Sequence, residues 1–531
     1  MNIIINLLGG LGLFLYGMNL MGEGLQKSAG NKLKKVIEFL TSNIIVGVIV
    51  GALVTAIIQS SSATTVMVVG FVNAGIMGLN QAIGVIMGAN IGTTITAQLV
   101  SLNLEGLAPI TLGIGIILYL FSSNYKIKHI AEILLGFGIL FTGMEFMKES
   151  VKPLAEFKRF TDSLIGFGQR PILGLLLGFS ITAIVQSSSA SMGMLIALAT
   201  QGLIPLSSAL PILYGQNIGT CVTSLISSIG ASKSAKRAAI IHLLFNIIGT
   251  ILFLLLLNKP MVEIVTRLNP EDVARQIANT HTIFNIVSVI MLLPFSKFIV
   301  KIAIKIIPDR NEGESEKTYL DDRILETPSI ALYNASKETL EMGKLSKECL
   351  KLSINGLFNN LNQDLDKSLK IEEKINKYQK NLLGYLLKLQ KHQITDNMIE
   401  EIDNLFNTIN DLERIGDHCE NISELGNEVI ELNIKFNKEI ENNIKIMFEQ
   451  VLKNCEDAIE LIENRDDNKS GDIIIRENKV NNIEQTIKKE YISKLNNNQN
   501  EIDMGLVSLE IIGNLERISD HCSNIARRYI K

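Results

Sequence analysis

Charge is missing from two long stretches of this chain. Residues 43–104 and residues 171–232 contain no Asp, Glu, Lys or Arg. Each stretch is long enough for about three helical crossings of a bilayer at ~20 residues apiece. A buried helical core in a soluble protein would need charged surface helices between the stretches, and the first half of the chain offers too few. Both stretches are therefore predicted to lie in a membrane.

Cysteine is scarce, and nucleotide-binding loops are missing. The five cysteines form an odd set without close spacing, so nothing indicates a disulfide framework. Four of them follow residue 307, where a reducing cytosolic setting fits. The chain has no Gly-x-x-x-x-Gly-Lys loop, which argues against ATP as a source of energy.

The chain divides near Pro308 into two parts of opposite charge. Residues 1–307 carry 20 Lys or Arg and 11 Asp or Glu, whereas residues 308–531 carry 30 and 43. Such a contrast indicates two different surroundings. We expect a membrane domain at residues 1–307, a polar linker at 308–325 and a helical domain at 326–531. Within the first, one repeat covers about 1–125, a second covers about 126–257, and extra helices continue to 307.

A polar motif occurs twice in these apolar surroundings. Gln59-Ser-Ser-Ser-Ala and Gly88-Ala-Asn-Ile-Gly-Thr return 127 positions later as Gln186-Ser-Ser-Ser-Ala and Gly215-Gln-Asn-Ile-Gly-Thr. Duplicated hydrophobic halves are typical of secondary transporters. Each serine run interrupts an apolar stretch too long for one helix and too short for two full crossings. This favours a re-entrant hairpin or a broken helix, which is tolerated in a bilayer only where it lines a cavity.

Basic clusters suggest how the repeats are oriented. Those at residues 27–35, 126–128, 233–237 and 297–305 are predicted to be cytoplasmic. If the turn at Glu105 lies outside, the first unit crosses an odd number of times, and the two repeats are inverted relative to each other. Residues 148–170 count against this scheme, because it places five Lys or Arg outside with only three acids. Inverted repeats would give two equivalent half-sites that exchange inward and outward exposure, as in an alternating-access carrier.

The repeated polar residues suit binding better than catalysis. Hydroxyls, carboxamides and freed backbone groups offer donors for an oxyanion and acceptors for a cation. Because no charge is available in either stretch, a buried dianion there needs an accompanying cation, and Na+ suits hydroxyl and carbonyl oxygens. The serines have no His or acidic partner nearby in the sequence, as a nucleophile requires, so we predict that the chain is not an enzyme. Close packing of helices is the alternative role for single serines.

A second duplication lies in the charged part. Leu412-Glu-Arg-Ile-Gly-Asp-His-Cys-Glu-Asn-Ile aligns with Leu515-Glu-Arg-Ile-Ser-Asp-His-Cys-Ser-Asn-Ile, 103 positions later. We expect two related three-helix bundles. In both copies Glu and Asp stand four residues apart, which places two carboxylates on one helix face. A solvated face, or pairing with the neighbouring Arg, is the simpler interpretation.

The paired serine and Asn-Ile-Gly-Thr motifs resemble those of the type II sodium-phosphate cotransporters, including the bacterial branch with a C-terminal PhoU-like domain. The resemblance covers essentially the whole chain. It implies an all-α polytopic membrane transporter with two inverted repeats containing re-entrant hairpins, followed by a cytosolic PhoU-like helical bundle. By motif, the implied ligands for phosphate and sodium are Gln59, Ser60, Ser61, Ser62, Gln186, Ser187, Ser188 and Ser189. Thr64 also belongs to the predicted site. So do polar residues of the two Asn-Ile-Gly-Thr motifs, namely Asn90, Thr93, Asn217 and Thr220.

The resemblance to PhoU raises the question of a metal. PhoU helices with repeated Glu-x-x-x-Asp motifs can hold divalent or iron ions, and the matching positions here are Glu413, Asp417, Glu516 and Asp520. Asn376 and Asn481 stand where Asp would complete the set. The membrane acidic residue of the family's electrogenic members is also missing, which favours electroneutral transport.

We therefore predict Na+-coupled transport of inorganic phosphate across the cytoplasmic membrane, with the cytosolic domain as regulator. The expected partners are phosphate, Na+ and the lipid bilayer, together with a cytosolic regulatory protein or a second copy of the chain, and no nucleic acid. The protein would be multi-pass, with its C-terminal domain in the cytosol. The alternatives are a membrane-anchored phosphate sensor, and a carrier for phosphate efflux or for another oxyanion.

Overall fold

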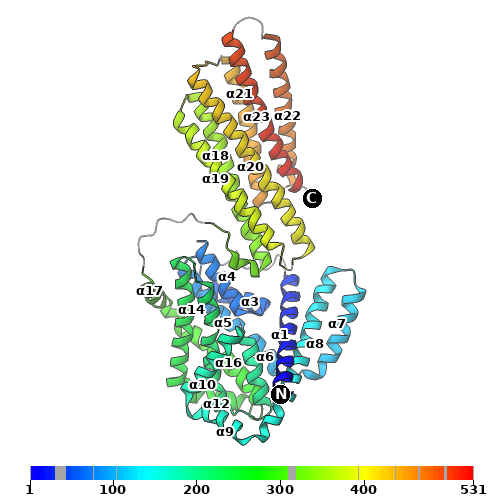
Figure 1. Ribbon diagram of the computed structural model, residues 1–531, viewed down its shortest axis with the longest axis vertical. Coiled ribbons are helices and arrows are strands. Elements are labelled where there is room, and N and C mark those ends of the chain that lie inside the picture. The colour runs from blue at the N-terminus through cyan, green and yellow to red at the C-terminus, as the bar shows by residue number, and fades with distance from the viewer. Residues whose placement is uncertain are drawn as a thin grey trace. The chain divides into compact units, whose positions relative to one another are not determined.

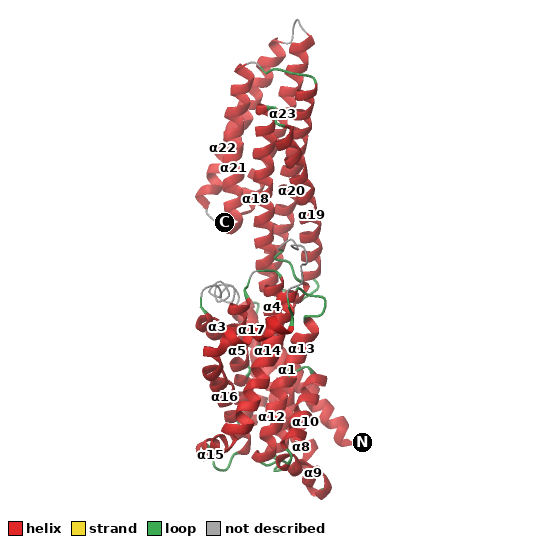
Figure 2. Cartoon of the chain, turned by 90° about the vertical axis from the view of Figure 1, so that its left-hand side faces the viewer, coloured by secondary structure: helices red, strands yellow, loops and turns green. Residues whose placement is uncertain are grey.

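A computed structural model describes residues 2–29, 43–75, 77–102, 104–308, 318–392, 394–436, 438–464, 467–494 and 499–529. Helices make up the fold, and this described part contains no strand (Figure 2). The all-α prediction is confirmed. The chain forms two compact units, Met1–Ser329 and Ile330–Lys531 (Figure 1). Of the predicted linker, residues 309–317 lie outside the described residues, as do residues 30–42 with most of the first basic cluster.

The first unit repeats one order of helices. The first series is α1 (Asn2–Ala29), α3 (Ile44–Ile58), α4 (Ser61–Asn73), α5 (Leu79–Gly92), α6 (Thr94–Ser101) and α7 (Ala108–Phe121). The second is α8 (Tyr125–Val151), α9 (Lys158–Gln169), α10 (Pro171–Val185), α11 (Ser188–Thr200), α12 (Leu206–Gly219), α13 (Cys221–Ser227) and α14 (Lys233–Leu252). The unit continues with α15 (Asn258–Leu268), α16 (Val273–Leu292) and α17 (Ser296–Ile306).

Five helical stretches among the described residues are long and apolar enough to cross a membrane, or six if one sharply bent pair forms a single span. They run over Ile3–Ala29, Leu79–Ser101, Tyr125–Glu156, Lys233–Leu268 and Val273–Ile306. The helices on either side of each serine run are shorter. α3 has 15 residues and α4 has 13, so each is about 20 Å long and falls short of a ~30 Å hydrocarbon core.

Glycines hold corresponding helices of the two repeats in very close contact. A Cβ on Gly88 of α5 would collide with the carbonyl oxygen of Val48 on α3. A Cβ on Gly215 of α12 would likewise collide with the carbonyl oxygen of Leu175 on α10. Both residues of each contact are 127 positions from their counterparts. The sequence duplication is thus also a duplication of packing, while the inverted orientation of the repeats stays a prediction.

The two repeats pack crosswise. Helix α4, which follows the first serine run, packs against α13 and α14, which follow the second Asn-Ile-Gly-Thr motif. Helix α11, which follows the second serine run, packs against α6, which follows the first Asn-Ile-Gly-Thr motif, and against α16. Each serine hairpin therefore lies beside elements of the opposite repeat.

The short 3-10 helix η6 (Asp322–Glu326) is bound to the end of α4 within the first unit. Asn73 at the end of α4 donates from Nδ2 to Asp321 Oδ2 at 2.8 Å and accepts at Oδ1 from the backbone N–H of Ser232 at 2.8 Å. Arg323 donates from Nε to the carbonyl oxygen of Ser227 at 2.7 Å. One carboxamide thus joins both repeats to the segment that leads into the second unit.

Asn73→Ala is expected to release this segment, because two bonds of about 1 kcal/mol each are lost and the buried Asp321 carboxylate keeps one partner fewer. Limited trypsin digestion of the full chain should then cut after Arg323 several times faster. Asn80→Ala, at an exposed position on α5, is the control and should leave the rate unchanged. Equal cleavage rates in the two variants would contradict the assignment.

The second unit consists of α18 (Pro328–Asn359), α19 (Asn362–Leu389), α20 (Asp396–Glu431), α21 (Lys438–Glu463), α22 (Asp467–Lys494) and α23 (Gln499–Tyr529). Its core includes the duplicated motif, because Leu412, Ile415 and Cys419 on α20 are fully buried. So are their counterparts on α23, Leu515, Ile518 and Cys522. The two helices pack side by side (Figure 1). Apolar residues recurring every three or four positions form such a buried face.

Candidate functional site

Each Gln-Ser-Ser-Ser run makes the turn between two short helices. Gln59 ends α3 with φ 61°, and Gln186 ends α10 with φ 55°. These left-handed conformations are uncommon for residues other than glycine. The next residues, Ser60 and Ser187, are extended and cap the following helices. The chain therefore stops one helix and starts another within two residues, in both repeats.

The three serines of each run have different tasks. Ser60 Oγ accepts a hydrogen bond from the N–H of Ala63 at 3.1 Å, and Ser187 Oγ accepts one from the N–H of Ala190 at 3.2 Å. These are helix N-caps. In the described part of the chain, the remaining hydroxyls make no hydrogen bond to protein, namely those of Ser61, Ser62, Ser188 and Ser189. Four hydroxyls are thus available to a ligand at the starts of α4 and α11.

The two glutamines differ although their backbones match. Gln59 is buried, accepts a 2.9 Å hydrogen bond at Oε1 from Thr96 of α6, and donates to the carbonyl oxygen of Ala56. Gln186 is exposed and makes no side-chain hydrogen bond within the described residues. The duplicated hairpins therefore have different surroundings, the first closed over its glutamine and the second open.

Thr64 stabilises the first hairpin internally. Its hydroxyl bonds that of Thr55 at 2.9 Å and the carbonyl oxygen of Ser60 at 3.1 Å, so it joins α4 to α3. In the second repeat the shorter Ser191 occupies this position and bonds only the carbonyl oxygen of Ser187, at 3.0 Å. The Thr182 hydroxyl, which corresponds to that of Thr55, is buried without a hydrogen-bond partner among the described residues. Thr64 is therefore placed to support the turn.

The Asn-Ile-Gly-Thr motifs lie at two helix breaks. α5 ends at Gly92 and α6 begins at Thr94, while α12 ends at Gly219 and α13 begins at Cys221. Asn90 and Asn217 are buried, and each donates from Nδ2 to the carbonyl oxygen four residues earlier, at 2.8 and 3.2 Å. Thr93 and Thr220 occupy the breaks themselves. Among the described residues, no hydrogen bond joins either Asn to a serine of the hairpins.

The structure also points to residues that the sequence analysis missed. Asn217 Oδ1 lies 3.3 Å from Nε2 of the buried His281 on α16. His281-Thr-Ile-Phe-Asn on α16 matches His242-Leu-Leu-Phe-Asn on α14. This five-residue repetition was the available signal, but its offset of 39 differs from that of the main duplication. No comparable repetition in the sequence pointed to Thr96, the hydrogen-bond partner of Gln59.

The four carboxylates predicted to hold a metal lie on two helices of the second unit. Glu413 and Asp417 are on α20, and Glu516 and Asp520 are on α23. No group of three or more His, Cys, Asp or Glu side chains suitable for a metal occurs among the described residues. Asp417 lies 3.4 Å from Arg414. Asn481 donates to Glu477 at 2.7 Å, and Asn376 donates to Glu372. As described, the four carboxylates do not form a group suited to a metal cluster.

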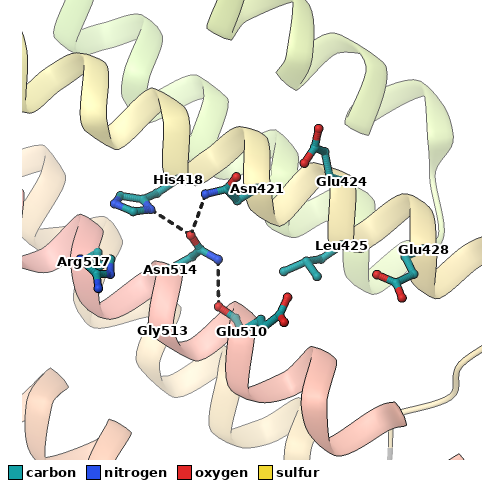
Figure 3. Close-up of a pocket in the computed structure, with 9 residues that line it drawn as sticks. All are labelled: His418, Asn421, Glu424, Leu425, Glu428, Glu510, Gly513, Asn514 and Arg517. Atoms are coloured by element: carbon teal, nitrogen blue, oxygen red, sulfur yellow. Dashed lines mark hydrogen bonds between the residues drawn. The ribbon is translucent and has the colours of Figure 1, made fainter.

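A surface pocket does lie between α20 and α23 (Figure 3). Asn514 occupies its centre, where its Oδ1 lies 2.9 Å from His418 Nδ1 and accepts from Asn421 Nδ2 at 3.2 Å. Glu424, Glu428 and Arg517 also line the pocket. None of the four carboxylates predicted as metal ligands is among its lining residues.

Glu372 gives the second unit a dependence on pH. Burial raises the pKa of its carboxyl from the ordinary 4.5 to about 7, and nearby Glu420 and Asp417 add to the shift. The folded state therefore holds this proton more tightly than the unfolded state, and stability falls as pH rises from about 4.5 to about 7. Glu372→Gln should remove this fall and stabilise the unit at pH 8 by on the order of 2 kcal/mol.

Hydrogen exchange in α19 of the full chain, compared between variant and wild type at pH 5 and pH 8, would measure the effect. Asp366→Asn changes an exposed acid on the same helix that does not contribute to the shift, and it should behave as wild type at both pH values. Equal protection of Glu372→Gln and wild type at pH 8 would refute the prediction.

Comparison with known proteins follows the same division of the chain. A model of the Na+/Pi-cotransporter family matches residues 13–149 and again residues 145–268. A PhoU domain model matches residues 339–426 and 444–529. The protein YqeW of Bacillus subtilis is 31% identical over 295 residues, which are 56% of this chain and 95% of that protein. The chain belongs to the Na+/Pi-cotransporter family. The resemblance noted in the sequence is thus confirmed, and the protein is a membrane protein with a C-terminal PhoU domain.

Two further relatives carry functional names. YjbB of Escherichia coli K12, whose name proposes the export of inorganic phosphate, is 22% identical over 527 residues, covering 98% of this chain and 96% of that one. The sodium-dependent phosphate transport protein 2A of Rattus norvegicus is 35% identical over 102 residues, 19% of this chain and 16% of that one. Among solved structures, PhoU from Pseudomonas aeruginosa aligns with a TM-score of 0.36 and 20% identity, covering 38% of this chain and 95% of that chain.

Proposed function

We propose that this member of the Na+/Pi-cotransporter family carries inorganic phosphate together with Na+ across the cytoplasmic membrane by alternating access. The observation that carries the proposal is the pair of hairpin turns. Each turn starts a helix of 13 residues, with two hydroxyls that bond no protein group among the described residues. The first N–H groups of a helix and the positive end of its dipole attract anions. Two such helix starts with serine hydroxyls form a donor-rich place for a phosphate oxyanion.

Charge balance supports the coupling to Na+. No charged residue lies in residues 43–104 or 171–232, so donors alone would have to hold a dianion in a medium of low dielectric constant. Hydrogen bonds return much less than the cost of burying such a charge. A cation bound with the phosphate reduces the net charge that crosses. Backbone carbonyls, glutamine oxygens and hydroxyls are ligands that suit Na+.

The difference between the hairpins supports alternating access. In a carrier with two equivalent half-sites, only one half faces an open path at a time. Here Gln59 is closed in by Thr96, while Gln186 is exposed. Helix α4 packs on α13 and α11 packs on α6. A movement of one hairpin can therefore displace helices of the opposite repeat. Exchange of the two states would move the site from one side of the membrane to the other.

The direction of transport follows the gradients of Na+ and phosphate, so uptake and efflux are two uses of one carrier. The PhoU unit is proposed to face the cytosol and to regulate the carrier. Asn73, Asp321 and Arg323 offer a route, because they tie the segment before that unit to the ends of α4 and α13.

The test is transport of radiolabelled phosphate by the purified full chain in proteoliposomes. An inward Na+ gradient should drive uptake and a K+ gradient should not. Vesicles loaded with phosphate and Na+ should show efflux when external Na+ is removed. Absence of phosphate movement in both directions under either cation would refute the proposal.

A further inference from the structure

Helices α14 and α16 share a buried line of polar side chains that the serine hairpins do not include. Each helix carries the five-residue pattern His-x-x-Phe-Asn, followed by a hydroxyl. All six polar side chains are at most 2% exposed. We call them the polar stripe: His242, Asn246 and Thr250 on α14, with His281, Asn285 and Ser288 on α16.

Two contacts fix how the halves of the stripe meet. A Cβ on Gly249 of α14 would lie 2.9 Å from Ser288 Oγ, and the rings of Phe253 and Phe284 are centred 4.7 Å apart. Phe253 follows Gly249 by four residues, whereas its partner Phe284 precedes Ser288 by four residues. The two helices therefore run antiparallel. Each histidine lies seven residues before the crossing, about 10 Å along its helix axis. The stripe thus extends about 20 Å, with a histidine at each end.

The asparagines of the stripe have their orientation settled by the backbone. Asn246 Nδ2 donates to the carbonyl oxygen of His242 at 3.1 Å, and Asn285 Nδ2 donates to that of His281 at 2.9 Å. A carbonyl oxygen accepts only from a donor, so neither amide can be reversed. Both Oδ1 atoms are buried and have no hydrogen-bond partner in the part of the protein that the structure describes, and the same holds for the hydroxyls of Thr250 and Ser288.

Each histidine of the stripe also has one buried ring nitrogen without a hydrogen-bond partner among the described residues. The hydroxyl of Ser224 donates to the carbonyl oxygen of Cys221 at 2.9 Å, so His242 Nδ1, at 3.2 Å from Ser224 Oγ, must be the donor. A neutral imidazole has one N–H, which makes Nε2 of His242 a bare acceptor. Asn217 Nδ2 donates to the carbonyl oxygen of Leu213 at 3.2 Å, which fixes the orientation of this amide. Its Oδ1 therefore accepts the hydrogen bond from His281 Nε2. His281 Nδ1 is then a bare acceptor too.

The stripe therefore presents four acceptors and two hydroxyls. Each hydroxyl has one proton to donate, so at least two of the acceptors stay unmatched within the stripe. Burying one unmatched polar group costs about 1 to 3 kcal/mol, so several in a row call for a ligand that supplies positive charge or protons. An anion would be repelled by the lone pairs of the four acceptors. Amide and hydroxyl oxygens are the hard, neutral ligands that alkali cations accept in a membrane interior.

We propose that the polar stripe binds Na+ through Asn246, Asn285, Thr250 and Ser288, at a place separate from the serine hairpins. The identity of the ion rests on the proposed function, whereas the existence of a cation site rests on the acceptors alone. α14 contacts α4 and α5 of one repeat and α12 and α13 of the other, and α16 contacts helices of both repeats as well. A cation held between α14 and α16 therefore acts on both halves of the carrier.

Binding of radioactive Na+ to the purified full chain, without phosphate, tests the site. Asn246→Leu with Asn285→Leu removes both amide oxygens at nearly constant volume, and we expect the affinity for Na+ to fall at least tenfold. Thr250→Val with Ser288→Ala is a gentler pair that should weaken binding several-fold if the leucine pair fails to fold. Asn80→Leu, on the exposed face of α5, is the matched control and should bind as wild type.

Unchanged Na+ binding in the two pairs would overturn the proposal and leave the stripe to buried water. Wild-type protein that binds no Na+ would overturn it as well. Phosphate transport by wild type, measured separately, distinguishes the two conclusions. Na+ bound at the stripe without phosphate transport would refute the carrier and keep the site, whereas sodium-driven transport with unchanged Na+ dependence in the leucine pair would keep the carrier and refute the site.

Discussion

Ser61→Ala combined with Ser188→Ala is expected to reduce phosphate transport by on the order of 100-fold or more, while the protein stays folded. Neither hydroxyl bonds a protein group in the described part of the chain, so its removal leaves no buried partner unsatisfied. A hydrogen bond to a charged ligand contributes about 1.5 to 3 kcal/mol. Two such bonds account for the expected loss. Initial rates of sodium-driven uptake in proteoliposomes measure it, with thermal unfolding as the check on folding.

Replacing the caps provides the contrast. Ser60→Ala with Ser187→Ala removes the bonds to Ala63 and Ala190, at a cost of about 0.5 to 2 kcal/mol each. This pair should lower the unfolding temperature while Ser61→Ala with Ser188→Ala leaves it nearly unchanged. The assignment of Ser60 and Ser187 as caps, and of Ser61 and Ser188 as ligands, would be wrong under one result. That result is loss of transport without loss of stability in the cap variants, together with normal transport in Ser61→Ala with Ser188→Ala.

Much of this architecture could be predicted from the sequence because it depends on patterns that any membrane protein must show. A stretch without charge must avoid water, and duplicated Gln-Ser-Ser-Ser runs indicate duplicated turns. The structure adds why the turn is possible, since Gln59 and Gln186 take the left-handed conformation. No periodicity in the sequence distinguishes a capping serine from a free one, because that depends on which N–H group lies within reach.

Other features could not be predicted because they arise from contacts between distant elements. Gln59 is buried and bonds Thr96, whereas Gln186 is exposed, although the two copies have the same local sequence. The acceptors of the polar stripe became visible only when the donors of Ser224 and Asn217 were traced to other carbonyls. In the PhoU unit, the Glu-x-x-x-Asp spacing predicted ligands on one face of each helix, but it could not say whether the two helices bring those faces together.

Gly88→Ala is expected to destabilise the membrane unit by roughly 3 kcal/mol, at the upper end of what overpacking costs. The added Cβ would collide with the carbonyl oxygen of Val48 and lie 2.8 Å from the N atom of Ala52. Backbone atoms cannot change rotamer to make room, so α3 must move away from α5 and the hairpin moves with it. Heat-induced loss of the monodisperse fraction in detergent measures the destabilisation, and phosphate transport should fall with it.

Gly113→Ala on α7 isolates the cause. Its Cβ would meet nothing within 4 Å, and both substitutions give the same gain in helix propensity of about 1 kcal/mol. Any difference between the two variants is therefore due to packing alone. Equal stability of both would show that α3 and α5 tolerate a wider separation. The close contact repeated at Gly215 and Leu175 would then be a consequence of small residues meeting, and the position of the serine turns would have to be fixed by other contacts, such as those of α4 with α13 and α14.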